Sequence, residues 1–131
     1  MINLIAIIIA ALVYFSVHFS WYFPFIFGNK WLKLVGKERE PKSKILRDTY
    51  IMIPTSFITV LILAIIIDML AISNFTGILI ISLLVWIGFV ATIGINQSNF
   101  NDRTSVLLFL IEYGFYLIGF IIAGLIIVIW P

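Results

Sequence analysis

Four long apolar segments, separated by short polar ones, dominate this sequence. The apolar segments cover about residues 2–27, 46–72, 77–96 and 104–130. At about 1.5 Å per residue, each is long enough for a helix that crosses the roughly 30 Å hydrocarbon core of a bilayer. The pattern predicts an all-α, polytopic membrane protein with a single domain, in which four transmembrane helices form an up-down bundle.

The composition agrees with this prediction and excludes several classes of site. The chain has 131 residues, of which 63% are hydrophobic and 11% are charged, whereas a soluble domain is about half apolar and about a quarter charged. The absence of cysteine and the presence of one histidine exclude a disulfide framework and a multi-histidine metal centre. We therefore expect no metal and no cofactor. We also expect no nucleic-acid partner, because no basic surface accompanies a soluble domain.

The first apolar segment begins directly after Met1 and lacks the features of a cleaved signal peptide. No basic region precedes it, and no small-x-small cleavage signal follows at the right place, so we expect a retained transmembrane helix. The segment ends in an aromatic cluster from Trp21 to Phe23, with Pro24 and Gly28 behind it. Aromatic side chains favour the membrane–water interface, and proline and glycine mark the end of a helix.

The basic residues are distributed very unevenly, and this distribution predicts the topology. Every Lys and Arg lies between residues 28 and 47 or at position 103. Under the positive-inside rule, the basic loop 28–45 and the third loop are cytoplasmic, and both termini face outside. We therefore predict a multi-pass protein of the cell membrane that contacts the lipid bilayer. The basic loop also favours weak contact with anionic lipid headgroups.

Glu112 is an ionisable residue within the last apolar segment. A carboxylate at such a place costs a few kcal/mol, so it is a candidate functional residue. Counted from Thr104, Glu112 lies about 12 Å in from the cytoplasmic end, and His18 lies about 13 Å in from the same side. We predict that these two side chains face each other.

Other polar residues fall at a similar depth, and together they predict one polar layer to which all four helices contribute. They are Thr55, Thr59, Thr92 and Tyr116. Tyr116 follows Glu112 by four residues and therefore lies on the same helix face. Two interpretations stay open. His18 and Glu112 form a proton-exchanging pair at the floor of a cavity, or they form hydrogen bonds that only fix the register of the helices.

Two classes of function fit these features. One is a small transporter or channel for a small solute, an ion or a proton that uses the His/Glu layer. The other is a non-catalytic membrane subunit or scaffold that packs against itself or against a larger membrane partner. Four helices leave little room for a pore, so transport would require a homo-oligomer. We expect no enzyme, because the sequence shows neither a nucleophile–base motif nor a metal cluster.

Several motifs resemble an uncharacterised family of small four-helix integral membrane proteins. They are Trp21-Tyr22-x-Pro24-x-x-Phe27-Gly28-x-x-Trp31, then Trp86-Ile87-Gly88-Phe89-Val90, and finally Tyr113-Gly114 followed by Gly119. Over nearly the whole chain, these motifs are similar to those of domain-of-unknown-function family 1761. One departure is Thr92, in a stretch where the family has a proline.

The resemblance implies the four-helix fold and fits a prokaryotic plasma membrane. It also marks a candidate structural motif, which consists of Trp21, Tyr22, Pro24, Gly28, Trp31, Gly114 and Gly119. The family has no established activity, so the resemblance implies nothing about chemistry.

Overall fold

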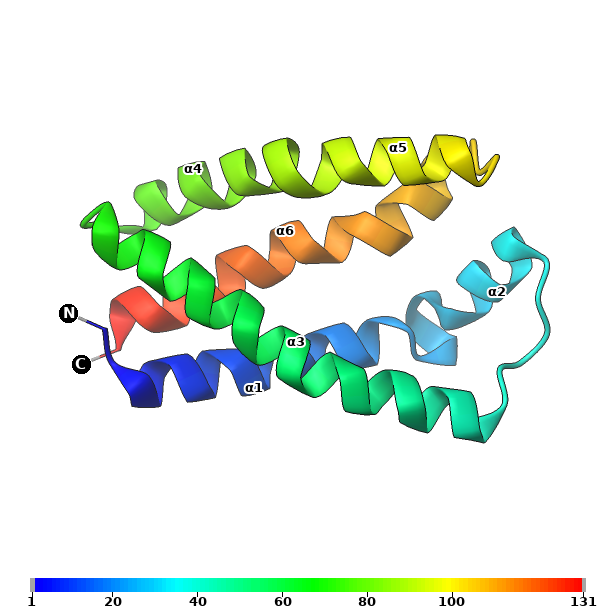
Figure 1. Cartoon of the computed structure of the whole chain (residues 1–131), viewed down its shortest axis with the longest axis horizontal. Coiled ribbons are helices and arrows are strands. Elements are labelled where there is room, and N and C mark those ends of the chain that lie inside the picture. The colour runs from blue at the N-terminus through cyan, green and yellow to red at the C-terminus, as the bar shows by residue number, and fades with distance from the viewer. Residues whose placement is uncertain (1, 131) are drawn as a thin grey trace.

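The computed structural model describes residues 2–130, which form a bundle of antiparallel helices (Figure 1). In chain order these are α1 (Leu4–Trp21), the π-helical turn η1 (Pro24–Gly28), α2 (Asn29–Val35), α3 (Lys42–Met69), α4 (Phe75–Val85), the π-helical segment η2 (Trp86–Ala91), α5 (Thr92–Phe100) and α6 (Val106–Ile129). Within the described chain, four helical stretches are long and apolar enough to cross a membrane: α1, α3, the continuous stretch Phe75–Phe100, and α6. The predicted all-α fold with four membrane-spanning helices is confirmed.

The first two spans differ from the predicted segments at the end where they are joined. Helix α1 ends at Trp21, before the predicted end at residue 27, because Phe23 adopts an extended conformation (φ −63°, ψ 144°). A residue before proline is disfavoured in the helical region. Helix α3 begins at Lys42, before the predicted start at residue 46. Its first turns are supported by an i,i+4 ion pair between Lys44 Nζ and Asp48 Oδ2 at 2.8 Å.

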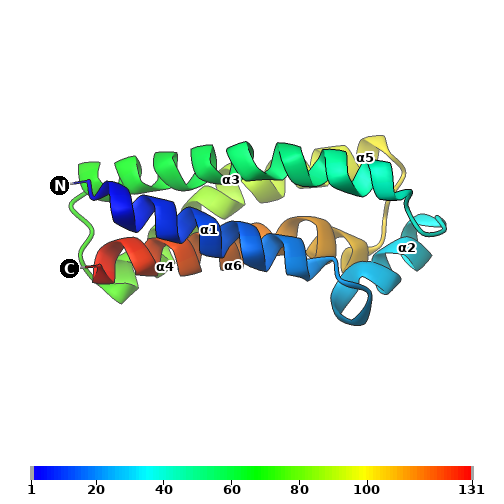
Figure 2. The same ribbon diagram turned by 90° about the horizontal axis from the view of Figure 1, so that it is seen from below.

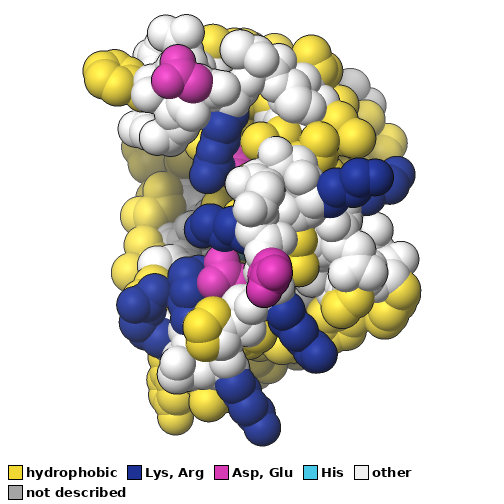
Figure 3. All heavy atoms as spheres, turned by 90° about the vertical axis from the view of Figure 1, so that its right-hand side faces the viewer, with side chains coloured by type: hydrophobic (Ala, Val, Ile, Leu, Met, Phe, Trp, Pro, Cys, Tyr) yellow, Lys and Arg dark blue, Asp and Glu magenta, His cyan; other side chains and the backbone are white. Residues whose placement is uncertain are grey.

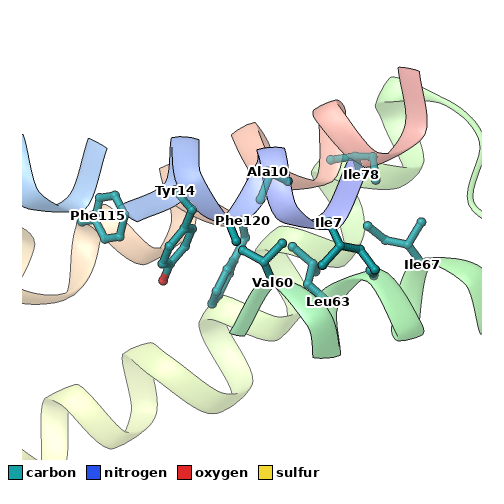
Figure 4. Packing of buried hydrophobic residues seen from close by; sticks show 12 residues of the cluster. Ile7, Ala10, Tyr14, Val60, Leu63, Ile67, Ile78, Phe115 and Phe120 are labelled. Atoms are coloured by element: carbon teal, nitrogen blue, oxygen red, sulfur yellow. The ribbon is translucent and has the colours of Figure 1, made fainter. Parts of the chain in front are cut away.

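Helices α1 and α6 form the centre of the bundle. Helix α3 packs against α1, and the third span, Phe75–Phe100, packs mainly against α6. Figure 4 shows how their buried side chains interlock. The core consists of Ile7, Ala10, Ala11, Tyr14, Val60, Leu63, Ala64, Ile67, Ile78, Phe115, Phe120 and Ala123. Small residues at the helix contacts let the backbones approach closely, which is how apolar helices associate without a hydrophobic driving force.

The two ends of the bundle differ in charge. Both ends of the chain and the α3–α4 turn lie at one end, while α2 and the α5–α6 link lie at the other (Figure 2). The second end carries the basic residues of the loops (Figure 3), and we call it the basic end. Its cytoplasmic orientation stays a prediction.

Gly119 tests the close packing of α1 on α6. In a Gly119→Ala variant, the new methyl group would lie 2.6 Å from Tyr14 Cε2 and 2.9 Å from Phe115 Cζ. Neither ring has room to move, since Tyr14 is 2% exposed and Phe115 is fully buried. We expect the free energy of unfolding to fall by about 1–3 kcal/mol, measured as a lower thermal midpoint in detergent.

The matched control for Gly119→Ala is Gly114→Ala in the same helix. A Cβ at Gly114 meets nothing within 4 Å, and alanine has the higher helix propensity. We expect an unchanged or higher midpoint for this variant. Equal losses in the two variants would contradict the packing described for Gly119.

Candidate functional site

The Glu112 carboxylate is held by two donors at the basic end of the bundle. It lies about 9 Å into α6, counted from Val106. Its Oε1 atom accepts hydrogen bonds from Arg103 Nη1 at 2.6 Å and from Trp31 Nε1 at 3.1 Å. The Glu112 side chain is only 15% exposed, against 34% for Arg103. A partly buried carboxylate is thus neutralised by a charge-assisted hydrogen bond.

The end of α5 directs Arg103 back toward α6. The Asp102 amide donates to Asn99 O and the Arg103 amide donates to Ser98 O, at 3.2 and 2.8 Å. These two bonds form a Schellman motif, which requires a left-handed residue at Asp102. Asp102 has φ 55°, a conformation that a short polar side chain tolerates better than most residues. This turn reverses the chain just before Ser105 caps α6 by accepting from the Leu108 amide.

Three tryptophan side chains donate to three consecutive residues of α6. Trp21 Nε1 donates to Ile111 O at 3.0 Å, Trp31 Nε1 donates to Glu112 Oε1, and Trp86 Nε1 donates to Tyr113 O at 2.8 Å. A helix carbonyl has two lone pairs and therefore has room for a second donor. We call Ile111, Glu112 and Tyr113 the anchor segment. It receives one indole from the end of α1, one from α2 and one from the third span.

Two π-helical segments accompany these tryptophans. Trp86 is the first residue of η2, and η1 lies between Trp21 and Trp31. In η1 the Phe23 carbonyl accepts from the Gly28 amide at 3.0 Å. A side chain at Gly28 would collide with the Tyr22 carbonyl, so the tight turn requires glycine there. The turn leads the chain into α2, which carries Trp31 to Glu112.

The predicted pairing of His18 with Glu112 is wrong. The His18 ring stacks on Phe115, with ring centroids 4.2 Å apart and planes 5° apart. The rings of His18 and Tyr116 meet edge to face, with their centroids 5.5 Å apart. Glu112 is bonded to Arg103 and Trp31 instead. Depth along a helix does not specify direction around it. Arginine, which is always charged and offers several donors, is also the stronger partner for a carboxylate.

The threonines do not join a common polar layer either. Thr55 and Thr92 are exposed, and each hydroxyl donates to its own helix, Thr55 to Ile51 O and Thr92 to Gly88 O. Thr59 is half-buried in α3. A hydroxyl that is satisfied by a carbonyl one turn earlier needs no partner in another helix. Tyr116 is the one member of the predicted layer that contacts His18.

Five of the seven residues of the candidate structural motif have an identifiable role in this arrangement, whereas a Cβ at Gly114 would meet nothing within 4 Å. Trp21 and Trp31 anchor α6, Pro24 and Gly28 shape η1, and Gly119 permits the contact with α1. The family motifs in the second half of the chain supply Trp86 and Tyr113. Trp21 and Trp31 of the motif thus contact the anchor segment directly.

A pocket of about 520 Å³ opens beside Glu112. It lies between the end of α1, η1 and α2 on one side and the start of α3 on the other. Tyr22 lines it, outside the four spans. Burial raises the pKa of the Tyr22 phenol well above its usual range, and the negative charge of Glu112 adds to the rise. The phenol is therefore neutral at physiological pH. Among residues 2–130, no group of three His, Asp or Glu side chains is placed to hold a metal ion.

Comparison with known proteins confirms the resemblance that the sequence motifs indicate. The chain belongs to the family described as "protein of unknown function (DUF1761)", whose model matches residues 5–128. No curated protein and no solved structure matches the chain.

The Arg103–Glu112 pair is open to a double-mutant cycle. Arg103→Gln removes the cation from a partly buried carboxylate, and we expect a loss of about 1–3 kcal/mol in the free energy of unfolding. Combining it with Glu112→Gln should cost clearly less than the sum of the single changes. The measurement is unfolding in detergent with a chemical denaturant.

The control cycle for this pair is Arg47→Gln with Asp48→Asn. These side chains lie 3.3 Å apart but are 66% and 45% exposed, so their coupling should be about 0–1 kcal/mol. If the coupling of Arg103 with Glu112 is as small as that of the exposed pair, the bond does not stabilise the basic end.

Proposed function

We propose that this protein is a small membrane carrier that binds a solute or an ion in the pocket at the basic end and recognises it through Glu112. The supporting observation is the position of the carboxylate. Glu112 belongs to a membrane-spanning helix, lines the pocket and uses only Oε1 for its two hydrogen bonds. Ionisable groups within spans are costly and mark the paths of solutes and ions.

Arg103 supplies the exchangeable partner in this proposal. It belongs to the link between α5 and α6 and is more exposed than Glu112. A solute, an ion or a proton that reaches Glu112 through the pocket competes with Arg103 for the carboxylate. Water can solvate the released guanidinium, because Arg103 lies on the outer side of the pair. Occupancy of the pocket is thereby coupled to the attachment of the α5–α6 link.

The proposed setting is a prokaryotic plasma membrane with the basic end in the cytoplasm. The gathering of basic side chains at one end supports this orientation. It also favours contact with anionic lipid headgroups. The proposal includes no catalytic step.

Flux through proteoliposomes with an interior pH dye tests the carrier proposal. Under a proton gradient, with candidate solutes added in turn, wild type should exceed empty vesicles. Glu112→Gln should lower the rate at least about tenfold, equivalent to about 1.4 kcal/mol in the barrier. Glu38→Gln is the matched control, because it makes the same change on an exposed loop residue that does not line the pocket. Equal flux in empty vesicles, wild type and Glu112→Gln would end the carrier proposal.

A non-catalytic subunit or scaffold is the second candidate function, and Gly88 supports it. A Cβ at Gly88 would meet nothing within 4 Å, so packing within the protomer does not explain this glycine. Thr92 follows four residues later, and both residues are exposed on the third span. Small residues at this spacing promote helix pairing in membranes. In this proposal the face packs against a second copy or a larger membrane partner.

Gly88→Leu tests the scaffold proposal. The bulky side chain should dissociate a complex formed through this face, measured by mass and cross-linking in mild detergent. Thr76→Leu, a small-to-large change at the other end of the same span, should leave the complex intact. A wild-type protein that is isolated as a lone protomer would overturn the scaffold proposal.

A further inference from the structure

The pocket beside Glu112 combines aromatic walls with a carboxylate. Its volume of about 520 Å³ falls within the usual range of small-molecule sites. Phe19, Tyr22, Phe23 and Trp31 supply aromatic rings to its lining. Aromatic faces carry a partial negative charge and attract cations.

The charges in the lining also favour a cationic ligand. Three carboxylates, Glu40, Asp48 and Glu112, line the pocket together with two cations, Arg39 and Lys44. Arg103 and Lys37, outside the lining, pair with Glu112 and Glu40. Lys44 is already bonded to Asp48 at 2.8 Å. The exposed Arg39 is therefore the remaining cation of the lining.

Two carboxylate oxygens of the lining accept no hydrogen bond from any described residue. Glu112 Oε2 takes no hydrogen bond from any residue between 2 and 130, because both donors bond to Oε1. Glu40 Oε1 is buried without a hydrogen bond, and the nearest Lys37 and Lys44 ammonium nitrogens lie 3.7 and 3.6 Å away. Glu40 Oε1 already forms ion pairs with both lysines, so Glu112 Oε2 is the acceptor that a cationic head would satisfy.

Trp31 already recognises an ammonium group within the protein. Lys37 Nζ lies 5.8 Å from the centre of the Trp31 ring, within the range of a cation–π contact. The same indole donates to Glu112, so it links a cation-attracting face to the carboxylate.

The position of the pocket indicates a ligand with an apolar body. Part of its lining comes from charged residues near the α2–α3 loop, and part from apolar residues of the spans, such as Phe19, Ile45 and Met52. Phe19 and Ile45 are themselves 37% and 43% exposed, so apolar surface continues from the pocket lining to the outside of the bundle. A ligand that enters along this boundary has one polar end and one apolar end.

We infer that the pocket binds an amphiphilic organic cation, with its charged head at Glu112 and its apolar body against Tyr22 and Trp31. This inference rests on the proposed carrier function and names its solute class. The cation takes Glu112 Oε2 and weakens the hold of Arg103 on the same carboxylate.

An amphiphilic anion, such as an anionic lipid, fits the pocket less well. Its head would meet Glu112 and the buried Glu40 oxygen, while the one cation of the lining without an ion pair to a described residue, Arg39, lies exposed at the surface. The two ligand classes therefore predict opposite charge selectivity.

Tetraphenylphosphonium and tetraphenylborate test this selectivity, because they share shape and apolarity but have opposite charge. The wild-type protein in phosphatidylcholine nanodiscs is titrated with each probe, and the change in fluorescence of its four tryptophans, of which Trp31 lines the pocket, reports binding. Empty nanodiscs that contain a tracer dye correct for partition into lipid. We expect saturable binding of the phosphonium and no competition from the borate.

Two variants should change the affinity for the phosphonium in opposite directions. Glu112→Gln should weaken phosphonium binding about tenfold, as expected for losing one charged contact. Arg103→Gln should strengthen it, because it frees the carboxylate, and this gain cannot result from misfolding. Glu38→Gln should leave the affinity unchanged.

Three outcomes would overturn the inference: stronger binding of the borate, phosphonium uptake that matches empty nanodiscs, or equal affinity in wild type, Glu112→Gln and Arg103→Gln. Equilibrium binding does not require transport, so the two proposals fail separately. Saturable, charge-selective binding without flux would refute the carrier and keep the site. Glu112-dependent flux without phosphonium binding would refute the solute class and keep the carrier.

Discussion

The bonding of three consecutive residues of α6 holds the basic end of this bundle together. Three indoles and one guanidinium, drawn from four separate parts of the chain, donate to Ile111, Glu112 and Tyr113. In an apolar medium such bonds are strong, and a buried donor without an acceptor destabilises the fold. Shifting α6 by one residue along its axis, or rotating it about that axis, would break several of these hydrogen bonds together. The anchor segment therefore fixes both the depth and the rotation of α6.

The opposite end is held by different means. Part of the packing toward that end is apolar and close, as where Ile78 of α4 packs against Gly124 of α6 and Ile67 of α3 joins the core. Close apolar packing of this kind resists rearrangement as a whole. The basic end depends on directional bonds, one of which involves a partly exposed arginine. In the proposed carrier, a movement linked to ligand binding is therefore expected at the basic end, with the apolar core as its fixed base.

The sequence predicts the spans and their order because long apolar segments have few other solutions in a membrane. It does not predict the partner of Glu112. The inference from depth assumed that α1 continues to residue 27, whereas it ends at Trp21 and leaves His18 in its last turn. Arg103 was interpreted only as a topology signal, since its direction depends on the left-handed turn at Asp102, which no glycine marks. The contact of Trp31 with α6 is not predicted for a similar reason, as the turn η1 that returns it to α6 is not a periodic pattern.

Because the ion-pair partner of Glu112 is an arginine, only certain ligands can separate the pair. Arginine stays protonated at every physiological pH, so Arg103 cannot relay a proton as histidine would. The pair opens only if something replaces the guanidinium at Glu112 or removes the charge of the carboxylate. A cation achieves the first and a proton the second, and both release Arg103. A single anion at Arg103 would leave Glu112 partly buried without its counter-ion. The free-energy cost of that unpaired carboxylate exceeds the stabilisation from an exposed bond between the anion and Arg103. In the proposed carrier, the pair would therefore favour a positively charged ligand, in addition to any contact that the walls of the pocket provide.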